Sequence, residues 1–323
     1  MSEVRSSAPQ SNPVQNPAQN TVQSTVQKNN AGIWFALSAY GLWGLFPVYF
    51  KWLEDVPAFE VLLHRVVWSV GFLLVLVLVT KRWKAFVTVI KQPKMLRWLT
   101  LSAVTMAINW LVFIWAVANE RILETSLGYF LNPLISIFLG MVFLSERLRR
   151  GQWIALSLAA AGVLAQVVIY GSLPWVALGV SISFGLYGLL RKQIPVESIL
   201  GLFVETLILL PFALGYMVWL EQQGTLTFGH GDWHTNGLLL VSGVVTSIPL
   251  LLFAAGARRL PLMMMGFLQY LVPTISFSLA VLVYNEPVDD AKLMTFMAIW
   301  VALVIFTLEG LRNRRKSLLK PVA

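Results

Sequence analysis

Long apolar segments alternate with short polar joints from residue 32 to residue 310. Each segment is near the ~20 residues that an α-helix needs to cross a hydrocarbon core of about 30 Å. The pattern therefore predicts an all-α chain with ten transmembrane helices. We place these helices at residues 32–51, 59–80, 98–118, 125–145, 152–171, 174–191, 197–219, 237–257, 262–284 and 292–310.

A 22-residue segment, Leu127–Leu148, occurs again 140 positions later, and the register extends upstream without a gap. Single matches between apolar helices are weak evidence, whereas an ungapped series is strong. The matched pairs are Ile108 and Ile248, Phe113 and Phe253, Leu131 and Leu271, Pro133 and Pro273, Ser136 and Ser276, and Glu146 and Glu286. The chain therefore divides into two five-helix units, at residues 31–171 and 172–310.

The composition supports a membrane protein. The chain has 57% hydrophobic and 12% charged residues, against roughly 25% charged residues in soluble domains. The net charge of +9 does not indicate nucleic-acid binding, because the basic residues lie in joints between apolar segments. With no cysteine, the chain has no disulfide, thiolate metal site or cysteine nucleophile.

Lysine and arginine alternate between the two sides of the predicted bundle. Of the 24 such residues, only Lys51, Arg121 and Lys292 fall on the side opposite the termini, and Arg65 lies within a span. Because cytoplasmic loops carry the excess of Lys and Arg, both termini are predicted to be cytoplasmic.

The two units are predicted to be inverted, because an odd number of helices returns the second copy from the other side. The loop charges agree: loop 81–97 is basic, whereas the corresponding loop 220–236 has no Lys or Arg. Inverted repeats are typical of secondary transporters that bind substrate between the repeats. A duplicated scaffold or a channel is the alternative.

The two ends of the chain differ in composition. Residues 1–30 contain no aromatic residue, leucine or isoleucine, so they are predicted to form a disordered cytoplasmic tail. Residues 311–323 form a basic cytoplasmic tail.

Several motifs resemble those of the RarD-type permeases, in the EamA-domain group of the drug/metabolite transporter superfamily. The resemblance covers about residues 30–310 and implies a ten-helix permease of the bacterial cytoplasmic membrane, with no defined substrate. The run Met263–Met265 departs from the smaller residues expected there. The matching segments are YGLWGLFPVYFK (40–51), HRVVWS (64–69), NW (109–110), SLGYFLNPL (126–134), SERL (145–148), SFGLYGLLRK (183–192), SIPLLLF (247–253) and GFLQYLVPT (266–274).

Among the prolines within predicted spans, we single out Pro47, Pro133 and Pro273. A proline inside a helix leaves the carbonyl of residue i−4 without its donor. In a membrane that carbonyl needs a partner from protein or water. We therefore expect kinked spans 125–145 and 262–284 to face each other across a central cavity, although kinks for packing alone are the alternative.

His64, Arg65 and Glu205 lie further from the ends of their predicted spans than the other charged residues do, and charge inside a membrane is costly and usually faces the protein interior. His64 and Arg65 lie near the external end of one span, and Glu205 lies near the cytoplasmic end of another. Arg65 either pairs with Glu205, binds an anionic group of a substrate, or extends to the interface. His64 either relays protons or, as we favour, forms a structural hydrogen bond. The remaining acids near span ends are expected to be solvated: Glu54, Glu60 and Glu309.

Neutral polar and aromatic residues complete the candidate substrate site. Buried amides need partners, and aromatic walls with a few amides suit a semi-polar organic molecule. Hydrogen bonds between helices are the alternative role. The set is Tyr40, Trp43, Asn109, Trp110, Tyr129, Asn132, Tyr187, Gln269 and Tyr270.

The sequence thus predicts a secondary transporter for a small organic metabolite or drug, with the lipid bilayer as its surroundings. A proton or another ion is the candidate coupling partner, and no nucleic acid, cofactor, catalytic residue or metal site is predicted. No ATP-binding P-loop is present. The alternatives are an uncoupled facilitator or channel and an intramembrane lipid-modifying protein. The oligomeric state is open between monomer and homodimer.

Overall fold

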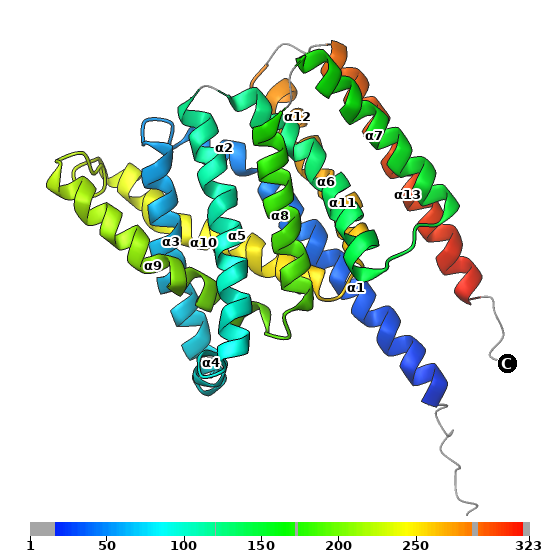
Figure 1. Ribbon diagram of the computed structural model, residues 1–323, viewed down its shortest axis with the longest axis horizontal. Coiled ribbons are helices and arrows are strands. Elements are labelled where there is room, and N and C mark those ends of the chain that lie inside the picture. The colour runs from blue at the N-terminus through cyan, green and yellow to red at the C-terminus, as the bar shows by residue number, and fades with distance from the viewer. Residues whose placement is uncertain (1–16, 120, 172–173, 286–289, 319–323) are drawn as a thin grey trace, which may run out of the picture.

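The computed structural model describes residues 17–119, 121–171, 174–285 and 290–318. Within these residues the regular structure is entirely helical (Figure 1). The helices are α1 (Pro17–Gly44), α2 (Phe46–Lys51), α3 (Ala58–Val79), α4 (Trp83–Ile90), α5 (Pro93–Ala118), α6 (Ile122–Leu144), α7 (Arg150–Tyr170), α8 (Trp175–Gln193), α9 (Ser198–Gln222), α10 (Trp233–Ala257), α11 (Leu262–Gln269), α12 (Leu271–Leu282) and α13 (Asp290–Leu318).

Among the described residues, eight helical segments are long and apolar enough to cross a bilayer. They comprise α1–α2, α3, α5, α6, α9, α10, α11–α12 and α13. The chain is therefore an integral membrane protein. Helices α7 and α8 form where spans were expected, but they are not among the eight. The count of ten spans stays a prediction.

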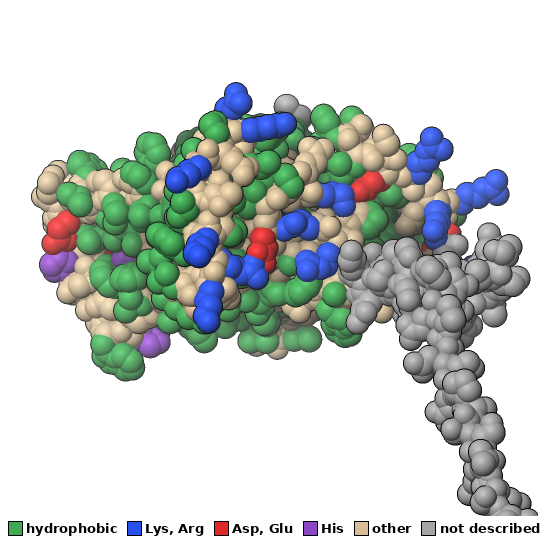
Figure 2. All heavy atoms as spheres, turned by 90° about the horizontal axis from the view of Figure 1, so that it is seen from below, with side chains coloured by type: hydrophobic (Ala, Val, Ile, Leu, Met, Phe, Trp, Pro, Cys, Tyr) green, Lys and Arg blue, Asp and Glu red, His purple; other side chains and the backbone are tan. Residues whose placement is uncertain are grey.

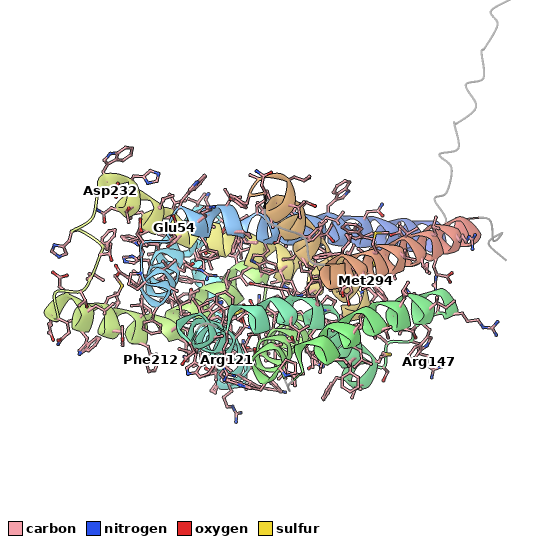
Figure 3. All side chains as sticks on the ribbon, turned by 90° about the horizontal axis from the view of Figure 1, so that it is seen from above. Glu54, Arg121, Arg147, Phe212, Asp232 and Met294 are labelled. Carbon is pink, nitrogen blue, oxygen red and sulfur yellow. The ribbon has the colours of Figure 1, made fainter. Side chains whose placement is uncertain are left out.

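The outer surface of the bundle is apolar. Phe212 is 76% exposed and Met294 67% exposed, and Figure 3 shows both on the outside of their helices. Large exposed apolar patches are rare on soluble monomers, whereas lipid covers them at no cost in a membrane.

The predicted disordered tail is too long. Helix α1 begins at Pro17, so residues 17–30 are helical. Extending an existing helix needs no new nucleus and adds one hydrogen bond per residue, so polar residues can continue a helix that apolar packing stabilises. Proline is favoured at the first position of a helix, because the N–H of the residue at that position forms no hydrogen bond within the helix. Residues 1–16 lie outside the described part.

Two of the three expected proline kinks coincide with helix breaks. Helix α1 ends at Gly44, and Pro47 lies in the first turn of α2. The helix containing Pro273 is interrupted at Tyr270, between α11 and α12. In contrast, α6 continues through Pro133.

The helices pack as interleaved pairs rather than in sequence order. Helix α1 packs against α10 and α12, whereas α8 packs against α5 and α6. Helix α3 packs against α9, and α6 against α11. Helices α7 and α13 lie side by side at one edge of the molecule (Figure 1). Segments from the two halves of the sequence are therefore in direct contact throughout the bundle.

The closest crossing joins α3 and α10. A Cβ atom built on Gly243 would lie 2.2 Å from the carbonyl carbon of Trp68 and 2.4 Å from the amide nitrogen of Ser69. The Ser69 hydroxyl donates a 3.1 Å hydrogen bond to the Gly243 carbonyl. Only glycine lets the two backbones approach this closely.

A polar loop joins α9 to α10. Asp232 caps α10 by accepting a 2.9 Å hydrogen bond from the Thr235 amide. Hydrogen bonding from Thr235 holds the pKa of the Asp232 carboxyl below its ordinary value. In Figure 3 Asp232 and Glu54 lie toward the same end of the molecule.

Candidate functional site

An aromatic cluster joins α1, α8 and α10. Phe253 lies at its centre, with ring centroids 5.6 Å from Trp43, 5.2 Å from Phe184 and 6.2 Å from Tyr40. Tyr187 stacks on Phe253 at 5.9 Å. The structure thus brings together Tyr40, Trp43 and Tyr187, which the sequence singled out. It adds Phe253, which the sequence marked only as the repeat mate of Phe113, and Phe184, which lies inside the motif SFGLYGLLRK.

A buried ion pair lies beside this cluster. Glu205 is 3% exposed, and its Oε1 lies 3.3 Å from Nη1 of the fully buried Arg191. The Tyr187 hydroxyl donates to Glu205 Oε2 at 3.4 Å, and Arg191 Nη2 donates to the Ser198 carbonyl at 3.3 Å. Arg191 was counted with the Lys and Arg of the cytoplasmic side, at the end of a predicted span; the structure shows that its side chain is buried and neutralises Glu205.

Glu205 and Arg65 do not pair, because they lie at opposite ends of two antiparallel helices. An Arg82–Glu197 ion pair joins the end of α3 to the start of α9. At the other end, Glu60 at the start of α3 binds the loop that follows α9. Arg65 belongs to the Glu60 end and Glu205 to the Arg82 end.

Arg65 is half-buried between aromatic rings. Its Nε donates a 2.8 Å hydrogen bond to the Thr246 hydroxyl. Its guanidinium carbon lies 5.6 Å from the Phe50 ring centroid and 5.3 Å from that of Trp110. The guanidinium also interacts electrostatically with Tyr49 and Tyr129, and the Tyr129 side chain is 40% exposed.

His64 belongs to a structural hydrogen-bond network. Its Nδ1 accepts a 3.0 Å hydrogen bond from Trp68 Nε1, and its Nε2 lies 3.7 Å from Glu60 Oε1. The Glu60 carboxylate accepts from the amides of Thr227 at 2.9 Å and Phe228 at 3.0 Å. The prediction that Glu60 is solvated is wrong: it is 1% exposed, because the loop after α9 folds over it and needs an acceptor for two amides.

The polar residues beside the prolines meet between α6 and α11. Ser136 Oγ donates to Gln269 Oε1 at 3.5 Å. Asn132 and Tyr270 are buried, and the Asn132 Oδ1 and the Tyr270 hydroxyl have no hydrogen-bond partner among the described residues. Asn109 has a different environment: its Nδ2 donates to the Val180 carbonyl at 2.8 Å and thus joins α5 to α8.

A charged contact closes one end of the α6–α11 interface. The Glu146 carboxylate accepts from the amides of Leu262 at 2.7 Å and Met263 at 2.8 Å, so it caps the N-terminus of α11. Lys192 Nζ lies 3.9 Å from Glu146 Oε1 and donates to the Ala257 carbonyl at 3.3 Å. The sequence indicated Glu146 through the repeat and SERL motif, but not its partners.

Basic side chains gather on one face of the molecule. Figure 2 shows numerous Lys and Arg side chains on the face seen from below in Figure 1. Among the residues that the structure describes, no three His, Asp or Glu side chains converge as metal ligands.

Comparison with known proteins identifies relatives across nearly the whole chain. Residues 30–168 match the EamA-like transporter family. An "Uncharacterized transporter" of Vibrio cholerae is 48% identical, covering 87% of this chain and 93% of the relative. "Protein RarD" of Escherichia coli is 47% identical over 88% of this chain and 97% of its own length. A solved structure, described as "Crystal structure of protein", shares the fold with a TM-score of 0.65 and 16% identity, over 86% of this chain and 97% of that one.

Proposed function

Because this chain belongs to the RarD-type permeases of the EamA-like transporter family, we propose that it is a secondary transporter of the bacterial inner membrane. It moves a small organic molecule by alternating access through a cavity between two inverted five-helix units. Both termini are cytoplasmic, in keeping with the positive-inside rule. The packing of the proline-containing helices carries this proposal.

The helix pairing supports the inverted repeat. In the 140-residue register, α5 corresponds to α10 and α6 to α11–α12, and α1 corresponds to α8 with a slip of one residue. The pairing of α1 with α10 and α12 thus has its counterpart in the pairing of α8 with α5 and α6. A close contact repeats as well: a Cβ on Gly44 would lie 2.6 Å from Ile275, and one on Gly185 would lie 2.8 Å from Ile135.

The difference between the two ends of α6 supports alternating access. The C-terminal part of α6 packs closely against α11, next to the Glu146 cap, whereas α6 touches α12 only marginally. Near the other end, the Tyr129 side chain is 40% exposed. We infer a conformation that is closed at the Glu146 end and open at the Tyr129 end. With the termini in the cytoplasm, the open end faces outward.

The substrate path proposed here runs from Tyr129 and Arg65 toward the closed α6–α11 interface. Asn132 and Gln269 supply polar contacts along it, and the aromatic cluster of α1, α8 and α10 forms an apolar wall. The buried Glu205–Arg191 pair and the His64 network support this framework. In this proposal the movement of substrate is coupled to a proton or another ion, which binds a titratable group along the substrate path.

Counterflow in proteoliposomes tests the transporter proposal. Compounds that raise the thermal unfolding midpoint of the purified protein are loaded inside, and uptake of labelled compound is measured. A carrier shows trans-stimulation, because the loaded site returns faster than the empty one, whereas a channel or facilitator pore shows none. Chemical conversion of the compound would instead support the enzyme alternative.

A pair of variants locates the path. Gln269→Ala should reduce exchange about tenfold, because it removes a buried polar contact worth about 1–3 kcal/mol. Gln223→Ala, on the exposed C-cap of α9, should leave exchange unchanged. Normal exchange by a folded Gln269→Ala protein would contradict a role for Gln269 in the path.

A further inference from the structure

We propose that Arg65 is the recognition group of an anion site, and that the transported molecule is an amphiphilic organic anion. This inference rests on the proposed transport function and names its substrate class. The ligand carries a carboxylate or phosphate that binds the guanidinium and an apolar or aromatic body that contacts the rings beside it.

The protein fixes the Arg65 side chain but leaves its binding edge free. Thr246 accepts from Nε, and Phe50 and Trp110 lie within cation–π distance of the guanidinium. Neither terminal nitrogen donates a hydrogen bond to a described residue, and neither is among the fully buried polar atoms without a partner. A guanidinium held in this way, with no protein acceptor on its two outer nitrogens among the described residues, has the geometry for bidentate binding of a carboxylate or phosphate.

No described carboxylate neutralises this charge. The nearest acid along α3 is Glu60, whose oxygens already accept the amides of Thr227 and Phe228. On the neighbouring helix α9, Glu205 is paired with Arg191. Around Arg65 itself the other polar neighbours are the neutral hydroxyls of Tyr49, Tyr129 and Thr246.

The internal repeat allows Arg65 to be compared with Glu205. Arg65 and Glu205 occupy equivalent positions, 140 residues apart. At the closed end the protein provides Glu205 with a buried arginine. At the other end Arg65 has aromatic rings and hydroxyls around it instead of a described acid. An uncompensated cation within a membrane is costly, so an anionic ligand stabilises this site while a cationic ligand is repelled.

The rings explain why the ligand is organic. An inorganic anion would use only the guanidinium, whereas Phe50, Trp110 and the exposed Tyr129 offer apolar contact beside it. The Tyr129 hydroxyl can donate to the same anionic group. Such a site favours a molecule with one anionic end and an apolar body.

A matched set of probes tests the charge requirement on the unmodified protein. Phenylacetate, phenylacetamide and phenethylamine share one ring but are anionic, neutral and cationic, and phenyl phosphate supplies the alternative anion. Kd values are obtained from the concentration dependence of the thermal unfolding midpoint. We expect at least one anion to bind about tenfold or more tightly than the amide, and the amine to bind weakest. Equal binding of the anions and the amide would overturn the proposal.

Variants then assign the effect to Arg65. Arg65→Gln should weaken binding of the preferred anion about tenfold, and Arg65→Lys should weaken it less, because lysine keeps the charge but loses the planar fork. Arg97→Gln removes an equal charge from an exposed position of α5 and should change nothing. Unchanged anion binding by folded Arg65→Gln would overturn the proposal. If Arg65→Gln does not fold, the Lys variant and the probe series decide.

Counterflow separates this inference from the transport proposal. An anion that needs Arg65 to bind but shows no trans-stimulation would support the site and contradict the transporter. Trans-stimulated exchange of a neutral or cationic compound that Arg65→Gln leaves intact would support the transporter and overturn the anion site.

Discussion

Two arginines lie in the interior of the bundle and differ in what surrounds their charge. Arg191 is completely buried and bound to Glu205, the Tyr187 hydroxyl completing the carboxylate's contacts. Arg65 is only half-buried and has no acidic partner among the described residues. The first charge is neutralised within the protein, whereas the second is the one that we propose binds a ligand.

Breaking the buried pair should destabilise the protein more than removing it. Glu205→Gln leaves the Arg191 charge uncompensated and should cost about 3–5 kcal/mol, whereas the double variant Glu205→Leu/Arg191→Met should recover much of that loss. Thermal unfolding in detergent measures both. Glu221→Gln, on the exposed end of α9, is the control and should have little effect. A single variant as stable as the parent would contradict this interpretation.

At the scale of helices, small residues decide how closely the elements approach. Helices α3 and α10 touch backbone to backbone at Gly243, and the Ser69 hydrogen bond spans the same crossing. Backbone atoms cannot move aside as a flexible side chain can. This crossing connects the helix of Arg65 to that of its hydrogen-bond acceptor, Thr246.

Substituting this glycine tests the crossing. Gly243→Ala should destabilise the protein by about 1–3 kcal/mol or more, because the added methyl would overlap the Trp68 backbone. Gly215→Ala in α9, where no heavy atom lies within 4 Å of the added Cβ, should instead gain about 0.5–1 kcal/mol from helix propensity. Unfolding midpoints of the two variants should therefore move in opposite directions.

At the scale of the whole molecule, the proposed transport cycle requires the closed end to open. Closure at this end depends on Glu146 capping α11 and on Lys192 beside it. Behind this cap lies the buried contact of Ser136 with Gln269. Weakening the cap should therefore shift the population toward the state open to the cytoplasm.

Thiol labelling measures that shift, since the chain has no cysteine and an introduced one reacts alone. Ser136→Cys, at a position only 4% exposed, should label slowly from the cytoplasmic face in inverted vesicles. Adding Glu146→Gln should raise its rate about fivefold for a loss of about 1 kcal/mol of capping energy. The control Glu221→Gln should leave the rate unchanged. Equal rates in all three proteins would contradict a closing role for Glu146.

The helices could be located from the sequence because the apolar pattern that marks each helix lies within its own residues. Apolar segments of membrane-spanning length, the breaks near Pro47 and Pro273, and the relatedness to RarD-type permeases all follow from neighbouring residues. The start of α1 was misplaced for the same reason: residues 17–30 look disordered by composition, whereas the helix they extend is stabilised by packing further along.

The site was predicted less completely, because its contacts join distant parts of the chain. The sequence singled out Glu205 and Arg65. It did not show that Glu205 pairs with Arg191, which leaves Arg65 without an acidic partner among the described residues. It placed Glu60 in solvent, although the loop after α9 buries it. Phe253 gains its central position only when α1, α8 and α10 meet.

The sequence by itself determined the membrane environment, the helical segments, the 140-residue register and the family, because composition and periodicity act along the chain. Only the tertiary structure decided which buried charge is neutralised, that Glu146 caps α11 and that Arg65 bonds to Thr246. The physical reason is that the cost of a charge in an apolar interior depends on its neighbours in space, and these come from helices far apart in sequence.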